Sequence, residues 1–255
     1  MSAAPKYHKA AEALVDAVID EVGKNIVLGL PLGLGKANHI ANALFERAVA
    51  DSSINLRIFT ALTLEPPAPA AGIARRFTDP LVERLFAGYP ALAYARAART
   101  GRLPPNITVN EFFLHAGHWL GVESAQQSYI SANYTHAARY MLEAGVNVVA
   151  QLVARRTDPS GTSFSLSCNP DITVDLLPAF ETIRQAGGTA VLLGQVNSEL
   201  PYMTGDAALE ESAFAHILEA PDCDFPLFAP PKPPVGLTAH ALGLHVARLM
   251  KDGGT

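Results

Sequence analysis

Apolar runs alternate with helix-like patterns along the chain, and Gly or Pro residues separate them. Residues 7–23 repeat apolar side chains every three or four positions and predict a helix that ends at Gly23. The apolar run 25–30 then predicts a buried strand, residues 36–50 a second helix, and residues 54–64 a second strand. Two strands joined by a helix are typical of a parallel β-α-β unit, so the pattern predicts an α/β fold.

The second half of the chain repeats this alternation. Helical patterns cover residues 134–144 and 171–186, and buried strands are predicted at 146–153 and 189–196. We therefore expect a three-layer fold, in which a mostly parallel sheet carries helices on both faces. A last amphipathic helix is predicted at 237–250.

The C-terminal part differs in composition from the rest. Residues 225–236 are Pro-rich and predict a semi-rigid linker after an α/β domain at 1–224. A helix and a Gly-Gly-Thr end follow at 237–255, which is an odd way to finish a domain. We interpret this segment as the lead-in helix of a second domain that lies beyond the chain.

Composition and charge exclude several classes of protein. The 255 residues are 49% hydrophobic, which excludes wholesale disorder, and the net charge of -5 is the wrong sign for a general nucleic-acid or anionic-membrane binder. Two cysteines, Cys168 and Cys223, are too few for a disulfide scaffold or a zinc ribbon, and Cys168 is expected to be buried and inert. No apolar run is long enough to span a bilayer, and the N-terminus lacks a secretory apolar region. We expect a cytoplasmic protein.

The segment from Gly29 to Lys36 is a glycine-rich turn between a predicted strand and a predicted helix. Backbone amides at such a place can bind an anion, but the segment can equally be a tight structural turn, and spacing leaves both readings open. It is not a Walker A loop, because Gly29 stands one residue too far away and Ala37 follows the lysine. It is not a dinucleotide fingerprint, because Asn38 replaces the third glycine.

Other candidate chemistry is weaker. His115 and His118 could share a helical face as metal ligands, but no third ligand is evident nearby, so no metal is expected. No Gly-x-Ser-x-Gly nucleophile elbow occurs. The polar loop that contains Asn197 and Pro201 follows a buried strand, and ligands of open α/β sheets bind at such strand ends.

Three motifs follow one another along the chain: a Gly-x-Pro turn at Gly29 and Pro31, an Asp-x-x-Gly turn at Asp158 and Gly161, and a loop with Val196, Asn197, Pro201, Gly205 and Asp206. Together they resemble the N-terminal half of the acetyl-CoA hydrolase / 4-hydroxybutyrate CoA-transferase family of class I CoA-transferases. The resemblance covers about residues 10–255, and the helix before KDGGT is similar to the family's lead-in to its second half.

The resemblance implies a CoA-transferase/isomerase-like fold and covalent catalysis by a glutamate that attacks an acyl-CoA thioester. CoA then passes to a small carboxylate, or water hydrolyses the intermediate. The family's glutamate and most CoA contacts lie in its second half, so no catalytic residue is assigned to this chain. The glutamates that fit no such motif are Glu111, Glu123, Glu143, Glu181, Glu199, Glu210 and Glu211.

The same resemblance assigns one wall of the substrate cleft to this chain. The implied substrates are acyl-CoA or CoA and a carboxylate, with no tightly bound cofactor. The expected partner is a C-terminal CoA-transferase domain or subunit, and a homo-oligomer is expected. The residues that we expect on the wall are Gly29, Pro31, Gly33, Asn197, Pro201 and Gly205.

Two other interpretations remain open. The chain could be a non-catalytic half-fold that binds CoA or a carboxylate, or the subunit of a two-chain CoA-transferase. The reading frame beyond Thr255 would separate these from an enzyme half. A phosphosugar isomerase of similar fold would need an acid/base cluster that the sequence does not provide.

Overall fold

Among the residues that the structure describes, seven parallel strands form the main sheet, in the order β1-β9-β7-β5-β2-β3-β4. The computed structural model describes residues 4–67, 71–159, 161–228 and 234–253. The strands are β1 (Lys6–His8), β2 (Asn25–Gly29), β3 (Asn55–Thr60), β4 (Ile107–Glu111), β5 (Val148–Asp158), β7 (Val191–Val196) and β9 (His216–Leu218). The predicted mostly parallel α/β sheet is therefore confirmed.

The order of the strands reverses at the middle of the sheet. From β2 the chain adds β3 and β4 on one side, and it then crosses to add β5, β7 and β9 on the other. The carboxyl ends of β2 and β5 therefore form a topological switch point. In open α/β sheets, the loops at such a point diverge and the crevice between them is the usual ligand site.

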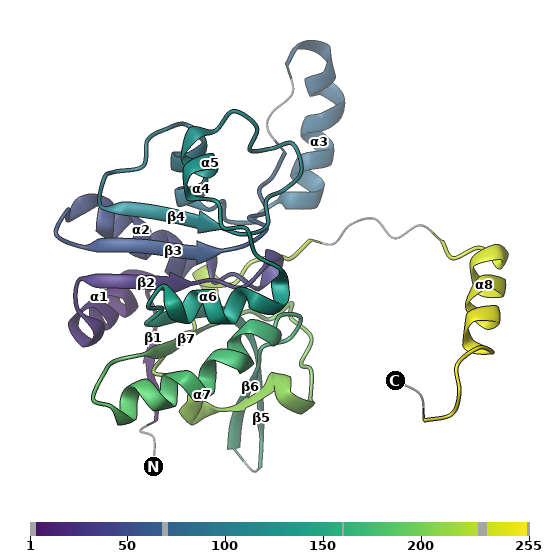
Figure 1. Cartoon of the computed structure of the whole chain (residues 1–255). Coiled ribbons are helices and arrows are strands. Elements are labelled where there is room, and N and C mark those ends of the chain that lie inside the picture. The colour runs from purple at the N-terminus through teal and green to yellow at the C-terminus, as the bar shows by residue number, and fades with distance from the viewer. Residues whose placement is uncertain (1–3, 68–70, 160, 229–233, 254–255) are drawn as a thin grey trace.

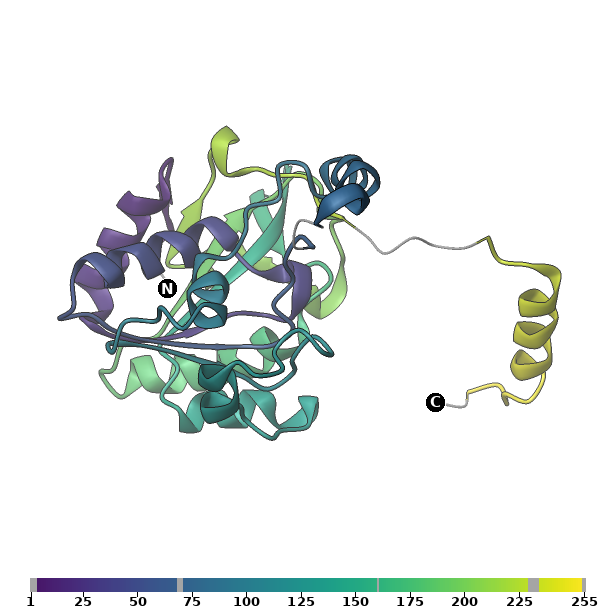
Figure 2. The same cartoon turned by 90° about the horizontal axis from the view of Figure 1, so that it is seen from above.

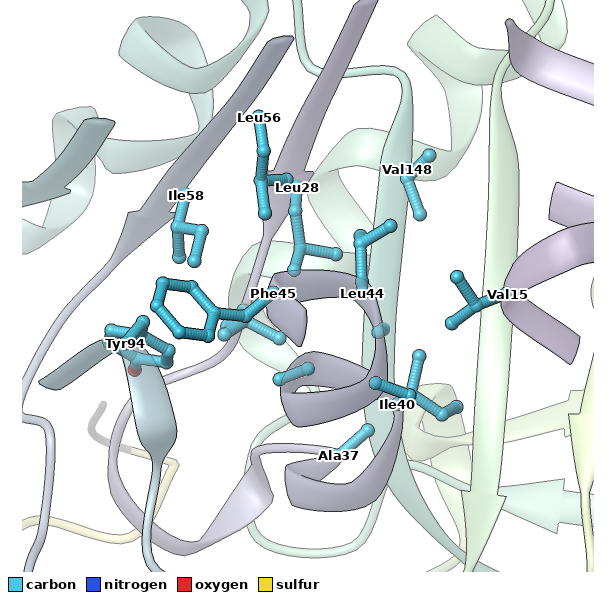
Figure 3. Packing of buried hydrophobic residues seen from close by; sticks show 14 of the residues in the cluster. Val15, Leu28, Ala37, Ile40, Leu44, Phe45, Leu56, Ile58, Tyr94 and Val148 are labelled. Carbon is cyan, nitrogen blue, oxygen red and sulfur yellow. The ribbon is translucent and has the colours of Figure 1, made fainter. Parts of the chain in front are cut away.

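Helices cover both faces of the sheet, as the three-layer prediction requires (Figure 1). One face carries α1 (Ala11–Val22), α2 (Asn38–Ala50) and α4 (Ala93–Arg99), and the other carries α6 (Ala137–Glu143) and α7 (Asp171–Gln185). Figure 3 shows Leu44 of α2 between Leu28 and Val148 of the sheet, with Ile40 of the same helix below it on the side of Val15. Each layer thus buries one apolar face, and the strands between them are apolar on both faces.

A hairpin extends the sheet at its carboxyl edge. Strand β5 continues beyond its parallel neighbours and pairs antiparallel with β6 (Gly161–Ser165), which in turn pairs with β8 (Ala208–Glu210). Asp158 and Gly161, the first and last residues of the predicted Asp-x-x-Gly turn, lie opposite each other as the last pair of this hairpin. Gly161 has φ 137, a conformation that favours glycine.

The start of the chain differs from its prediction. The periodicity of residues 7–23 predicts a helix, but α1 begins at Ala11, and Lys6–His8 forms the edge strand β1. This strand pairs with β9, so that Tyr7 lies opposite Ile217. A pairing partner so distant in sequence leaves no local signal, which explains the error.

Two helices extend from the body and bury no residue: α3 (Arg75–Phe86) and α8 (Leu237–Ala247) (Figures 1 and 2). The predicted linker at 225–236 falls partly on 229–233, outside the described residues, and its first residue, Phe225, is buried in the body. The predicted domain boundaries remain a prediction. No helix within the described ranges has the length and apolar character needed to cross a bilayer.

Candidate functional site

The loop after β2 carries three of the predicted wall residues. Gly29 ends the strand, and a side chain there would meet the Met141 methyl at 2.4 Å, so glycine allows α6 to pack closely. Pro31 is buried. Gly33 begins the short 3-10 turn Gly33–Gly35 with φ 62, which is the left-handed conformation that glycine adopts without strain.

A buried lysine fixes this loop to the end of β3. Lys36 has no exposed surface, and burial lowers its pKa to about 7 against the opposing effect of Glu111. Its Nζ donates to the carbonyl oxygens of Pro31, Ala61 and Leu62, at 2.7, 2.6 and 3.4 Å. Three acceptors match the three donors of an ammonium group, so Lys36 holds two strand-end loops together. Leu62 has φ 42, an uncommon conformation for leucine, at the same place.

The N-terminus of α2 is occupied by a side chain of the protein itself. The buried Gln195 of β7 accepts hydrogen bonds through Oε1 from the amides of His39 (3.1 Å) and Ile40 (3.4 Å). Its Nε2 lies 2.9 Å from His39 Nδ1 and donates to the Cys223 carbonyl at 3.0 Å. Two amides that could have received an anion are thus already bonded, which favours the structural reading of the glycine-rich turn.

The loop after β7 carries the other predicted wall residues. Asn197 is buried; its Nδ2 donates to the Phe225 carbonyl at 2.8 Å and its Oδ1 accepts from the Glu199 amide at 3.0 Å. Pro201 and Gly205 are exposed, and Gly205 has φ 73. Asn197 therefore shapes the loop, while Pro201 and Gly205 lie on its surface.

The segment 165–169 joins these two loops. Ser167 Oγ donates to the Pro201 carbonyl at 2.8 Å, and Ser165 Oγ donates to the Met203 carbonyl at 2.8 Å. On its other side, a side chain at Gly35 would come within 2.4 Å of Asn169 Oδ1. The predicted wall residues of the two loops therefore lie along one edge of the sheet, with this segment between them.

The buried side chain of Gln151 also connects segments that meet at the switch point. Gln151 of β5 donates to the carbonyls of Leu166 (3.2 Å) and Asn169 (2.7 Å) and accepts from Thr173 Oγ1 at 2.5 Å. The backbone at Gln151 also forms an isolated bridge with that at Lys36. The backbone therefore pairs across the switch point, and the buried Gln151 side chain holds the neighbouring loops in place.

A carboxylate is buried beside the same edge, at the end of β4. Glu111 Oε1 accepts from the Thr63 amide at 2.7 Å. Burial raises the pKa of Glu111, while the Thr63 amide, Lys36 and Arg99 act in the opposite direction. Thr63 Oγ1 in turn lies 3.1 Å from the hydroxyl of the buried Tyr94. Glu111 is therefore a structural acceptor for the loop after β3.

Three cavities of the described chain, of about 650, 490 and 440 Å³, lie away from the predicted wall. One of about 650 Å³ borders the amino end of β7 and is lined by Lys6, Glu21 and Arg184, among others. A second, of about 440 Å³, lies beside the β5–β6 hairpin and is lined by Arg156 and Tyr202. None of the six predicted wall residues lines any of the three cavities.

Two weaker candidates can now be placed. The rings of His115 and His118 stack with centroids 4.0 Å apart on an exposed turn, and no group of three potential metal ligands occurs among the described residues. The prediction that Cys168 is buried is wrong, because the residue is exposed at the carboxyl edge. Partial burial of its thiol still raises the pKa of Cys168, which disfavours the reactive thiolate.

Sequence reasoning missed the residues that build this edge, namely Lys36, Glu111, Gln195, Ser165 and Ser167. A usable signal existed for Gln195, because a lone amide stands in the apolar run VLLGQV and a buried amide needs partners. Lys36 gave no such signal, since lysines are rarely buried.

Comparison with known proteins shows the fold. No family model matches the chain, and no curated protein matches it in sequence. RipA from Yersinia pestis is similar in structure, with a TM-score of 0.59 and 19% identity over 96% of this chain and 49% of RipA. A variant of RipA gives a TM-score of 0.61 with 18% identity.

A 4-hydroxybutyrate CoA-transferase from Porphyromonas gingivalis is a more distant match, with a TM-score of 0.43 and 14% identity over 87% of this chain and 40% of that chain. A similarity at this level does not establish a shared fold by itself. The chain is thus an α/β protein with the fold of the matching part of RipA, and it spans about half of RipA's length. Identities below 20% show fold and not activity.

Proposed function

We propose that this chain is the N-terminal half of an acyl-CoA hydrolase or CoA-transferase and forms one wall of its substrate cleft. The observation that carries the proposal is the placement of the family-like loops. The Gly29–Pro31 turn and the Asn197–Pro201 loop are far apart in sequence but follow strands on either side of β5. Ser167 and Asn169 connect them along one carboxyl edge, the edge at which open α/β sheets bind ligands.

Helix α8 supports a second half as the partner. Its apolar residues point in all directions around the helix axis, yet every described residue of the helix is exposed. Leu237, Leu242 and Leu244 are among them, at 86, 66 and 69% exposure. A helix that is apolar all round is stable in water only when it is buried on all sides, so α8 requires a surrounding protein core.

Helix α3 supplies a second unpartnered apolar surface. Phe77, Leu81 and Leu85 are spaced four residues apart and are exposed, so they form one stripe, and the exposed Ile73 of the preceding 3-10 turn (Gly72–Ala74) continues the spacing. The described start of the predicted linker is anchored at the base of this helix, where the rings of Phe86 and Phe228 are 4.6 Å apart. A domain connected through α8 would therefore be tethered close to the stripe.

The division of labour in the proposal follows from the described residues. The buried Glu111 and Lys36 hold loops, and no glutamate of this chain matches the family's nucleophile. The attacking glutamate belongs to the second half, where it would displace CoA thiolate from the thioester carbonyl. This chain then contributes positioning of the substrate and, by itself, has no turnover.

The test compares two proteins in the same assays. Hydrolysis is followed by the loss of thioester absorbance from acetyl-CoA, because the exposed Cys168 would consume thiol reagents. Transfer of CoA to excess succinate or propionate conserves the thioester, so it is followed by mass spectrometry of the new acyl-CoA, and transfer to acetate is followed with isotopically labelled acetate. The 255-residue chain and the product of any reading frame that continues past Thr255 are compared. We expect activity from the longer protein alone. Activity of the 255-residue chain would place a nucleophile within it and refute the proposal, and a frame that stops at Thr255 would favour a separate partner subunit.

A further inference from the structure

Three titratable side chains connect the edge strand β1 to the body of the protein. His8 lies on β1, His216 on the neighbouring strand β9, and Glu21 near the end of α1. Nε2 of His8 is 2.9 Å from Nδ1 of His216, and Nε2 of His216 is 3.0 Å from Glu21 Oε2. His216 has no exposed surface, so water cannot replace either partner.

The Glu21 carboxylate determines which ring nitrogens of the two histidines carry hydrogens. Because ionised Glu21 can only accept, Nε2 of His216 carries a hydrogen and its Nδ1 accepts from Nε2 of His8. One added proton leaves the bond between the rings intact, since one of the facing nitrogens still has a lone pair. A second proton places N–H groups on both facing nitrogens, and the bond is lost.

We propose that the His8–His216 pair is a pH-sensitive clamp that holds β1 on the sheet at neutral pH and releases it when the pair becomes doubly protonated. The strand has only three residues at the edge of the sheet, so few contacts compete with the clamp. They include two backbone bonds, from the Lys6 amide to the Ala215 carbonyl and from the Glu219 amide to the His8 carbonyl, and one from the Tyr7 hydroxyl to Glu211.

The charges around the two histidines agree with a release of β1 at low pH. The pKa of His8 is lowered by burial first, and then by His216 and Lys6. Because the lowered pKa means that folding disfavours the charged ring, protonation of His8 makes the folded arrangement less stable as pH falls, and the bond between the rings is lost with the second proton. Glu21 and Asp20 on α1 are the nearby acids, and the Glu219 carboxylate is paired with Arg155 at 2.6 Å.

Release of β1 would change the cavities of about 650 and 440 Å³ described above. Ala4 lines both of them, Lys6 lines the larger and Pro5 the smaller. Removal of this segment would join the two cavities and expose the edge of β9, so acidification would open a new surface. This inference is independent of the proposed acyl-CoA chemistry.

Amide hydrogen exchange on the 255-residue chain tests the clamp. Rates at the Lys6 and Glu219 amides are measured at about pH 7.5 and about pH 5, corrected for the intrinsic pH effect and compared with the Leu30 amide in the central sheet. In the wild type we expect the corrected rates to rise about tenfold at low pH, while the Leu30 rate does not change.

The variant His8→Gln is the matched control. A glutamine amide can donate through Nε2 or accept through Oε1, so it can bond to His216 in either protonation state, and the rates should not depend on pH. His8→Leu should exchange fast at both pH values. An equal acceleration in the wild type and His8→Gln, or no acceleration in the wild type, would overturn the proposal.

Discussion

Replacing Gln195 by leucine should lower the free energy of unfolding more than the same substitution at an exposed glutamine. The substitution keeps the size of the side chain but removes every hydrogen bond that Gln195 makes. Three of its partners lie within 3.1 Å, namely the His39 amide, His39 Nδ1 and the Cys223 carbonyl. The Ile40 amide, at 3.4 Å, is a weaker fourth.

The magnitude follows from the burial of these partners. A buried polar group that loses its partner costs about 1–3 kcal/mol, and loss of a helix N-terminal acceptor alone costs about 1 kcal/mol. His39 is half-buried, so water can compensate part of its loss. We therefore expect the free energy of unfolding to fall by about 3 kcal/mol.

The assay is urea unfolding of the 255-residue chain, followed by circular dichroism. Gln126→Leu is the matched control, because Gln126 is exposed and its substitution should change stability by less than about 0.5 kcal/mol. A loss below about 1 kcal/mol for Gln195→Leu would show that the α2 amides do not depend on this side chain.

Three further outcomes are expected. Gly35→Ala should lower the melting temperature, because its methyl group would lie 2.4 Å from Asn169 Oδ1. Asn169→Gly should relieve part of this loss when the two substitutions are combined. An equal loss from Gly35→Ala in the wild type and in the Asn169→Gly variant would contradict the contact. In alkylation followed by mass spectrometry, Cys168 should react in the native protein but more slowly than a free cysteine, whereas buried Cys223 should react only after denaturation; the reverse order would be incompatible with the structure. Burial lowers the pKa of Lys36 from 10.5 to about 7, so the unfolded chain binds more protons between these values and stability should rise with pH there. Lys36→Met should remove this rise, and identical pH curves for the two proteins would exclude it.

An analysis of hydrophobic periodicity does not identify the polar residues that lie within buried strands. Gln151 and Gln195 each interrupt an apolar run, and each proves to be the centre of a hydrogen-bond network that joins several loops. The sequence reveals that such a residue needs partners, because an unpaired buried amide is costly. It does not reveal which loops supply them, because those loops are distant in sequence.

The sequence by itself determined the layers of this protein. Apolar runs with glycine or proline at their ends specified the strands, and helical periodicity specified helices such as α2 and α7, because both signals are local. It also placed the turns at Gly29 and Asn197 after strands, where a site could form.

Only the tertiary structure decided which segments meet. The pairing of β1 with β9, the burial of Lys36 among three carbonyls and the row of His8, His216 and Glu21 all join distant residues. It also showed that Gln195 already binds the N-terminus of α2, where spacing left an anion possible. These contacts depend on the order of the strands, which short-range propensity does not encode.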